Sequence, residues 1–391
     1  MTQAIRVMVI DDSAVFRSWL VQSLSADSRF EVVGFATNAL DAQNKLPLLK
    51  PDILTLDIEM PGMSGIDFLK KLLPVHPIPV ILVSSLNLRV FDALEAGAVD
   101  FVRKPDASQG LSREIFMNTL KTKLVMAASS HVHLPPSHMK SAKSTYGASP
   151  GASPQNQRLG NFGKSGSFPA GNSRAGLAVS SGTGRAAAPV PSNPLFRYKD
   201  SSPYVIAIGA STGGTEAILE VVRQFPANTP GVVITQHMPA GFTAMYADRL
   251  NRSCAMEVRE AKNGDHIRPG LILLAPGGMQ MRVVAQGNAY SVSVLPGEKV
   301  NGHRPSVDVL FDSVAAHVRQ KAIGVLLTGM GADGAAGLLR MRKNGAFTIG
   351  QDKNSCVVYG MPMEAWRIGA VCRQLPLNTI GQAVLNQLAR P

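Results

Sequence analysis

Short apolar runs alternate with helical patterns over residues 1–130. The runs IRVMVIDD, FEVVGFAT, DILTLDIEMPG, PVILVSS and DFVRKP each end in loop residues or lead into a stretch such as SAVFRSWLVQSL, whose apolar positions recur at helical spacing. Strand–helix alternation of this kind predicts an α/β domain with a parallel, doubly wound, flavodoxin-like sheet of about five strands.

The same rhythm returns over residues 200–391. The runs YVIAIGA, GVVITQH, LILLAP and AIGVLLTGM predict buried strands, and the alternating stretch MRVVAQGNAYSVSVLP predicts a β-hairpin. We therefore expect a second α/β domain with a doubly wound, Rossmann-like parallel sheet.

Residues 131–199 differ from both flanking parts. Ser, Gly, Ala and Pro dominate this stretch, and no apolar period is sustained in it. Such a composition cannot bury enough apolar surface to form a core, so we expect a long disordered linker. The chain then divides into domains at 1–130 and 200–391, joined by residues 131–199.

The net charge of +12 raises the question of a nucleic-acid partner. Residues 131–199 carry eight Lys and Arg and no Asp or Glu, so most of the excess lies outside the two expected domains. Residues 200–391 also show no helix-turn-helix or winged-helix pattern. We therefore expect no nucleic-acid partner, although a response regulator with a DNA-binding or non-catalytic output domain remains an alternative.

Cysteine usage and hydropathy suggest where the protein resides. The three cysteines include no C-x-x-C pair, so neither a disulfide framework nor a zinc site is indicated. The first apolar run is only as long as a strand, unlike the core of a signal peptide, and no run reaches the eighteen or so residues of a membrane helix. We expect a cytoplasmic protein.

Polar residues follow the strands of the first expected sheet. Asp11 and Asp12 follow the first strand, Asp57 the third, Ser84 the fourth and Lys104 the fifth. Because these strand ends meet in one crevice, the side chains should face each other. Three carboxylates repel one another unless a divalent cation joins them, which favours Mg²⁺, whereas a lysine and a hydroxyl suit a phosphoryl group. Helix capping explains any single position, but not all five together.

The stretches VIDDS, LDIEMPGMSGIDFL, VSS and FVRKP resemble the receiver domain of two-component response regulators over about residues 4–125. The resemblance implies that Asp57 is the phosphoacceptor. It also implies that Mg²⁺ is held by Asp11, Asp12, Asp57 and the carbonyl group of Glu59. Ser84 and Lys104 would contact the phosphoryl group, and Phe101 would reorient together with Ser84 on activation.

A serine lies in the Gly-flanked turn IGASTGG of the second domain. The G-x-S-x-G pattern is weak alone, but here a strand enters the turn, a helix leaves it, and the hydroxyl of Ser211 can project at the sheet edge. Backbone N–H groups at that helix start could receive an oxyanion. His237 after one strand would supply the base and Asp333 after another the orienting acid.

Other interpretations of the serine turn remain. The order Ser, His, Asp differs from that of the α/β-hydrolases, so the pattern does not indicate that fold. A dinucleotide-binding turn lacks support because the G-x-G-x-x-G spacing is missing and no clear acidic residue closes a second strand. A plain structural turn is the third reading.

The stretches IGASTGGTEAI, TQHMPAGFTAMYADRLN, LAPGGMQM, GHRPSVDVLFDSVA and LLTGMGADGAAGLL together resemble the catalytic domain of the chemotaxis protein-glutamate methylesterases, over about residues 203–388. The resemblance implies a serine hydrolase in which Ser211 is the nucleophile, His237 the base and Asp333 the acid. It places Thr212 and Met330 at the active-site wall or oxyanion region. His303 and Arg304 would line the approach to the active site or have a structural role before the following helix.

The same resemblance implies the partners of the protein. Methyl-accepting chemoreceptors would be the substrate, reached at the cytoplasmic side of the membrane, and a chemotaxis histidine kinase the phosphodonor. Demethylation would need no cofactor, since Mg²⁺ serves only the receiver. Some members of this family also deamidate receptor glutamines, and the residues of this sequence do not decide that point.

Overall fold

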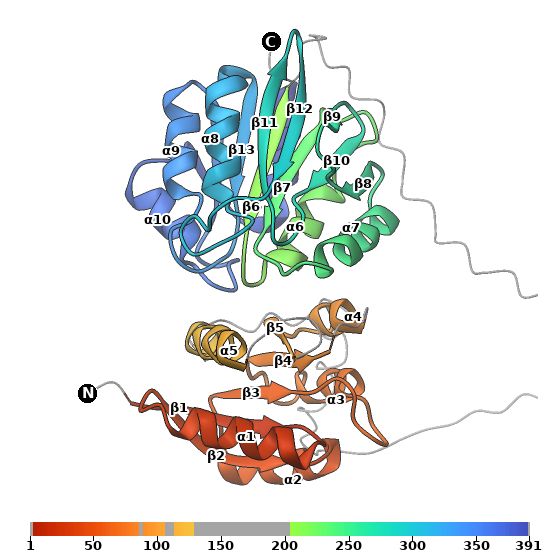
Figure 1. Cartoon of the computed structure of the whole chain (residues 1–391), viewed down its shortest axis with the longest axis vertical. Coiled ribbons are helices and arrows are strands. Elements are labelled where there is room, and N and C mark those ends of the chain that lie inside the picture. Colours follow the sequence, from red (N-terminus) through yellow and green to blue (C-terminus); the bar gives the residue numbers. More distant parts are fainter. Residues whose placement is uncertain (1–2, 86–88, 106–112, 129–203, 390–391) are drawn as a thin grey trace, which may run out of the picture.

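The computed structural model describes residues 3–85, 89–105, 113–128 and 204–389. The predicted linker, residues 131–199, lies outside the described residues. Within them the chain forms two α/β domains, each built around its own parallel sheet (Figure 1). None of the helices in these four ranges is long and apolar enough to cross a bilayer.

The N-terminal domain contains the predicted five-stranded parallel sheet, in the order β2-β1-β3-β4-β5. Its strands are β1 (Ile5–Ile10), β2 (Phe30–Ala36), β3 (Ile53–Leu56), β4 (Val80–Ser84) and β5 (Asp100–Arg103). Its helices are α1 (Ala14–Ser25), α2 (Ala39–Leu49), α3 (Gly65–Leu72), α4 (Arg89–Glu95) and α5 (Arg113–Ala128). Helices α1 and α5 pack on one face of the sheet and α2, α3 and α4 on the other, as expected for a doubly wound fold.

The C-terminal domain contains a seven-stranded parallel sheet in the order β15-β14-β13-β6-β7-β10-β8. Its strands are β6 (Val205–Ala210), β7 (Val232–Gln236), β8 (Glu257–Glu260), β10 (Leu271–Leu274), β13 (Ala322–Leu326), β14 (Phe347–Gln351) and β15 (Arg373–Leu375). The helices are α6 (Gly214–Val222), α7 (Phe242–Ser253), α8 (Val307–His317), the short 3₁₀ turn η2 (Arg319–Lys321), α9 (Ala335–Lys343), α10 (Met361–Arg367) and α11 (Leu377–Leu388). The central strands are buried along their whole length, which is why they appear in the sequence as continuous apolar runs.

The predicted hairpin is confirmed. Strands β11 (Gln280–Gln286) and β12 (Ala289–Leu295) pair antiparallel, and β9 (His266–Ile267) adds a third short strand. This small sheet packs with α8 on one face of the large sheet, whereas α6, α7 and α11 cover the other face.

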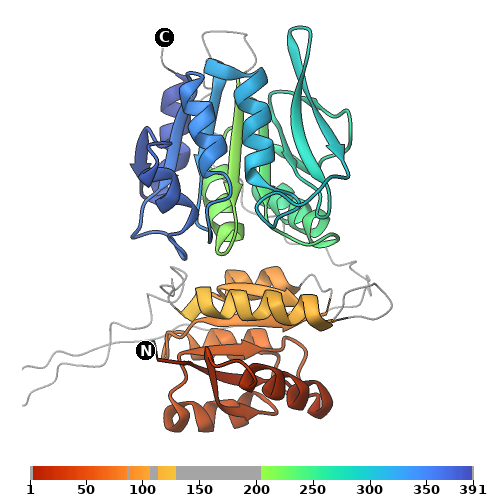
Figure 2. The same cartoon turned by 60° about the vertical axis from the view of Figure 1, so that its left-hand side comes forward.

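The two domains are in contact through apolar side chains. The edge strand β5 and helix α4 of the N-terminal domain face the C-terminal domain in both views (Figures 1 and 2). The ring of Phe91 stacks on that of Tyr246 with centroids 5.5 Å apart, and the rings of Phe101 and Phe242 lie 4.5 Å apart. One buried apolar cluster therefore runs from the first domain into the second.

Candidate active site and phosphoacceptor pocket

Ser211 lies directly after the buried strand β6, in the tight turn that leads into α6. Its N–H donates to the Thr328 carbonyl oxygen at 3.0 Å, and its own carbonyl oxygen accepts from Gly214 N–H at 2.7 Å. The turn requires φ = +76° at Gly213, a conformation that glycine adopts without strain. The backbone on both sides of the serine is therefore fixed.

The three residues predicted as nucleophile, base and acid follow three adjacent strands. Strand β6 pairs in parallel with β7 on one side and with β13 on the other, so their carboxyl ends share one edge of the sheet. His237 Nε2 lies 2.7 Å from Asp333 Oδ2, and these side chains are 7% and 2% exposed. The structure thus brings the predicted base and acid together beside the serine turn.

Asp333 is held at the N-terminus of α8. Its carboxylate accepts hydrogen bonds from Asn301 Nδ2 at 2.8 Å, Ser306 Oγ at 2.8 Å and Val307 N–H at 2.7 Å. Burial alone would raise the pKa of Asp333, but the bond from His237 and these further donors hold the pKa well below its usual range. Asp333 is therefore ionised, and His237 Nε2 must carry the proton of their hydrogen bond.

The other ring nitrogen of His237 is free to act. Nδ1 is buried and has no hydrogen-bond partner among the described residues, and no hydrogen bond joins it to Ser211 Oγ there. Such a bond often forms only when substrate binds. With Nε2 protonated, Nδ1 holds the lone pair, so it is the atom that can accept a proton from the serine.

Thr212 and Met330 are predicted to lie at the active-site wall or oxyanion region. The hydroxyl of Thr212 donates to Asp100 Oδ2 of the N-terminal domain at 2.7 Å, so that side chain takes part in the domain contact. The backbone N–H groups of Thr212 and Gly213 make no hydrogen bond within the described ranges, which leaves them available as oxyanion donors. Met330 lies on the Gly-rich loop after β13 and is 39% exposed.

Gly329 provides a test of how closely this loop approaches the nucleophile. A Cβ atom at Gly329 would lie 2.8 Å from Ser211 Cβ, 3.0 Å from Ser211 N and 2.3 Å from Met361 Sδ. Because the serine backbone must move to relieve these contacts, Gly329→Ala is expected to lower kcat about 100-fold, the effect of a misplacement of roughly 1 Å.

The measurement for Gly329→Ala is esterase activity at equal folded fraction, monitored by circular dichroism. The control is Gly287→Asn at the tip of the β11–β12 hairpin, where an added side chain meets nothing within 4 Å and φ = +60° suits asparagine. Wild-type activity in Gly329→Ala would show that the loop does not fix the serine.

Two further residues near the triad have distinct positions. His303 stacks on His237 with ring centroids 3.6 Å apart and planes 9° apart. Arg304 is exposed and donates to the Gly297 carbonyl oxygen at 2.7 Å, so it supports the local loop. Sequence reasoning missed the Asp333 donors Asn301 and Ser306, although the turn-forming pair NG at 301–302 and a serine just before a helix are recognisable signals.

The second site lies at the carboxyl ends of β1 and β3. Carboxylate oxygens of Asp11, Asp12 and Asp57 lie within 4.8 Å of one another, and Lys104 Nζ lies 2.6 Å from Asp57 Oδ2 and 2.9 Å from Asp11 Oδ2. Burial raises the pKa of Asp57 despite the lysine. Burial would lower the pKa of Lys104, but the two carboxylates outweigh it and raise that pKa. This oxygen-rich, negatively charged pocket fits Mg²⁺.

The remaining predicted residues surround Asp57. The N–H of Glu59 donates to Asp57 Oδ1 at 3.2 Å, which places the Glu59 backbone beside the acceptor. Ser84 Oγ is buried and has no hydrogen-bond partner among the described residues. Phe101 is 5% exposed and contacts the C-terminal domain through Phe242.

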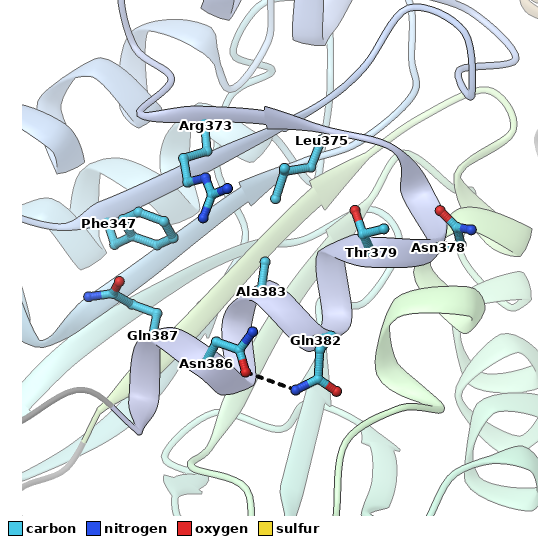
Figure 3. A pocket seen from close by; sticks show the side chains of 9 residues that line it. All are labelled: Phe347, Arg373, Leu375, Asn378, Thr379, Gln382, Ala383, Asn386 and Gln387. Atoms are coloured by element: carbon cyan, nitrogen blue, oxygen red, sulfur yellow. Dashed lines mark hydrogen bonds between the residues drawn. The ribbon is translucent and has the colours of Figure 1, made fainter.

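A pocket of about 350 Å³ lies elsewhere, between β15 and α11 (Figure 3). Arg373 and Phe347 line it from the strand side, and Gln382 lines it from the helix. None of its lining residues belongs to the two sites described above.

Comparison with known proteins identifies the family. The CheB methylesterase family model matches residues 206–384, and that of the response regulator receiver domain matches residues 7–116. A protein-glutamate methylesterase/protein-glutamine glutaminase of Syntrophomonas wolfei is 46% identical over 387 residues, which cover 98% of both chains. The chain belongs to the CheB methylesterase family. A relative of the same name in Syntrophotalea carbinolica is 44% identical over 393 residues, covering 100% of this chain and 99% of the relative.

The crystal structure of the Thermotoga maritima CheB methylesterase catalytic domain is also similar. It is 34% identical, with a TM-score of 0.47, and the match covers 48% of this chain and 99% of that one. The family match confirms that this is a CheB methylesterase with a receiver domain in front, as its motifs suggested. The alternative of a DNA-binding or non-catalytic output domain finds no support in these comparisons.

Proposed function

We propose that this chain is a phosphorylation-controlled esterase that hydrolyses glutamate γ-methyl esters on chemoreceptors and releases methanol. The observation that carries the proposal is the buried His237–Asp333 pair, 2.7 Å apart, at the strand ends that flank Ser211. The names of the full-length relatives supply the substrate class. We place the activity in the cytoplasm, with residues 1–130 as receiver, 131–199 as linker and 200–391 as catalytic domain.

The first half of the reaction forms an acyl-enzyme. Ser211 Oγ attacks the ester carbonyl carbon while His237 Nδ1 takes the hydroxyl proton, and the ionised Asp333 stabilises the resulting imidazolium. The oxyanion is held by the backbone N–H groups of Thr212 and Gly213 at the start of α6, which have no partner among the described residues. The C–O bond to the methoxy group then breaks, and methanol leaves with the proton returned by His237.

The second half releases the receptor. Water attacks the acyl carbon and gives a proton to His237, and the Ser211 oxygen leaves with that proton, so a glutamate carboxylate remains. The receptor gains one negative charge for each ester cleaved. The same residues acting on a glutamine side chain would release ammonia in place of methanol, and the names of the relatives include a glutaminase.

The assay that tests the function is methanol release from methylated receptor membranes. The full chain treated with phosphodonor is expected to release methanol, and the receptor glutamates should become free carboxylates by mass spectrometry. A well-folded wild-type chain that releases none would overturn the proposal. Ammonia release from receptors with unmodified glutamines tests the second activity separately.

The receiver would control this reaction through Asp57. Its carboxylate accepts the phosphoryl group from a chemotaxis histidine kinase, and Lys104 and the buried Ser84 hydroxyl then bind the phosphoryl oxygens. Asp11, Asp12, Asp57 and the carbonyl group of Glu59 would hold Mg²⁺, which supplies charge neutralisation for phosphoryl transfer.

A small phosphodonor with Mg²⁺ is expected to phosphorylate the chain at Asp57. Labelling should disappear in Asp57→Asn, because an amide cannot form the acyl phosphate, and should fall strongly when EDTA removes Mg²⁺ from the carboxylate cluster. Mass spectrometry after borohydride trapping measures the modified residue. The control is Asp52→Asn, an exposed carboxylate outside the pocket. Label that persists in Asp57→Asn would move the acceptor elsewhere.

A further inference from the structure

His303 contacts the base of the triad through its ring face alone. The two imidazole rings are nearly parallel, with centroids 3.6 Å apart and planes 9° apart. Among the described residues the ring of His237 makes one hydrogen bond, from Nε2 to Asp333, and its Nδ1 has no partner there. One bond at one nitrogen fixes a point of the ring but not its plane, so the stacked ring supplies the second restraint.

His303 belongs to a turn that also holds the triad acid. Val300 and His303 exchange backbone hydrogen bonds of 3.0 and 2.9 Å, and the intervening Asn301 and Gly302 have φ of +53° and +82°, as in a two-residue hairpin turn. The Asn301 amide donates to Asp333 Oδ1 at 2.8 Å. A single rigid turn therefore contacts both the base and the acid.

We propose that His303 is a positioning residue for the esterase reaction, whose stacked ring holds the plane of His237 so that Nδ1 faces the Ser211 hydroxyl. The proposal rests on the proposed esterase function. His303 exchanges no proton itself. A second consequence is electrostatic: an aromatic face, rather than a second cation, lies against the imidazolium that forms when His237 takes the serine proton.

The surroundings of His303 keep its ring neutral. Burial and the neighbouring His237 lower its pKa to about 4. Lys299 of its own loop and Lys123 of α5 act in the same direction, and only Asp333 opposes them. Because this pKa lies below the ordinary value for histidine, the ring stays uncharged throughout the neutral range and remains a stacking partner there.

The test compares His303→Phe, which keeps a flat ring, with His303→Ala, which removes it, in the full phosphorylated chain. We expect His303→Ala to lose 10- to 100-fold in kcat with little change in KM, the effect of a misplaced base. His303→Phe should restore most of that rate with an unaltered pH profile. His266→Ala, an exposed histidine of β9, is the matched control.

A spectroscopic measurement distinguishes a positioning role of His303 from a purely structural one. In ¹⁵N-labelled protein, the His237 Nε2–H signal should be single in wild type and His303→Phe, and broadened or doubled in His303→Ala. If both His303 variants lose activity together with one limb of the pH profile, His303 exchanges protons and the proposal is wrong. If His303→Ala is fully active with a single signal, the stack has no role. A wild-type chain that releases no methanol would overturn the proposed function. The His237 Nε2–H signal would still test whether His303 positions the His237 ring.

Discussion

Replacing Ser211 by alanine is expected to lower esterase activity by at least about 10⁴-fold without unfolding the chain, because the nucleophile is lost while the turn keeps its backbone bonds. His237→Ala and Asp333→Ala should each cause a comparable loss. The double variant Ser211→Ala/His237→Ala should lose hardly more than either single one, since the three residues act as one unit. Methanol release and burst-phase acyl-enzyme formation measure these effects.

Asp308, in the first turn of α8, is a matched control for the acid Asp333. Asp308 also lies at the N-terminus of α8, but its carboxylate accepts from Gly337 N–H at 2.6 Å and from Asn301 Nδ2 at 2.7 Å, and no hydrogen bond joins it to His237 among the described residues. Asp308→Asn should therefore affect stability more than kcat, whereas Asp333→Asn should affect kcat, because an amide favours the wrong tautomer of His237. A Ser211→Ala chain that still forms an acyl-enzyme would remove Ser211 from the mechanism.

Local sequence predicted the five strands of the first sheet, the central strands β6, β7, β10 and β13 of the second and both clusters of strand-end residues, whereas the strands β8, β14 and β15 were not predicted. The successes have a clear physical reason. Buried parallel strands appear as continuous apolar runs, and the residues that follow them must meet at one edge of the sheet. This is how Asp57 and Lys104, 47 positions apart, could be placed together before their distance of 2.6 Å was known. Local sequence does not show which strands pair with β6, because strand pairing is a tertiary contact. Strand β13 lies beside β6 although many elements separate the two strands in the chain.

Contacts that depend on loop register or on docking could not be predicted in this way. Asn301 and Ser306 reach Asp333 from about 30 positions away through a turn and a helix start. The hydroxyl of Thr212, a residue assigned to the active-site wall or oxyanion region, binds Asp100, 112 positions earlier in the other domain. Side chains that lie on a domain interface carry no periodic signal, because either domain alone would leave them exposed.

Weakening the domain contact is expected to raise the basal esterase activity of the unphosphorylated chain. Phe101, the residue predicted to move with Ser84, packs on Phe242, and its neighbour Asp100 accepts the Thr212 hydroxyl beside Ser211. The receiver thus lies against the nucleophile turn, and phosphorylation at Asp57 should shift the population toward an open form. Asp57→Ala should stay at basal activity with or without phosphodonor, whereas deletion of residues 1–130 should raise activity.

Two receiver variants test the interface without touching the catalytic domain. Asp100→Ala removes a buried charged acceptor from Thr212, a bond worth about 1.5–3 kcal/mol, so the open population should rise about 10- to 100-fold. Phe91→Ala removes the ring stacked on Tyr246 and should act in the same direction. Leu48→Ala, 81% exposed on α2, is the matched control, and phosphorylation at Asp57 verifies that each receiver is folded.

The measurement is methanol release by the unphosphorylated chains on receptor membranes, beside the isolated fragment 200–391. The esterase activity of the variants should approach that of the fragment. Phosphodonor should raise it little, because the variants are already in the open form. The Ser-, Gly-, Ala- and Pro-rich composition of residues 131–199 predicts a linker that transmits no force, so we expect the contact surface between the domains to carry the control. Equal activity of the wild-type full chain and the fragment would mean that the contact between Asp100 and Thr212 does not restrain Ser211.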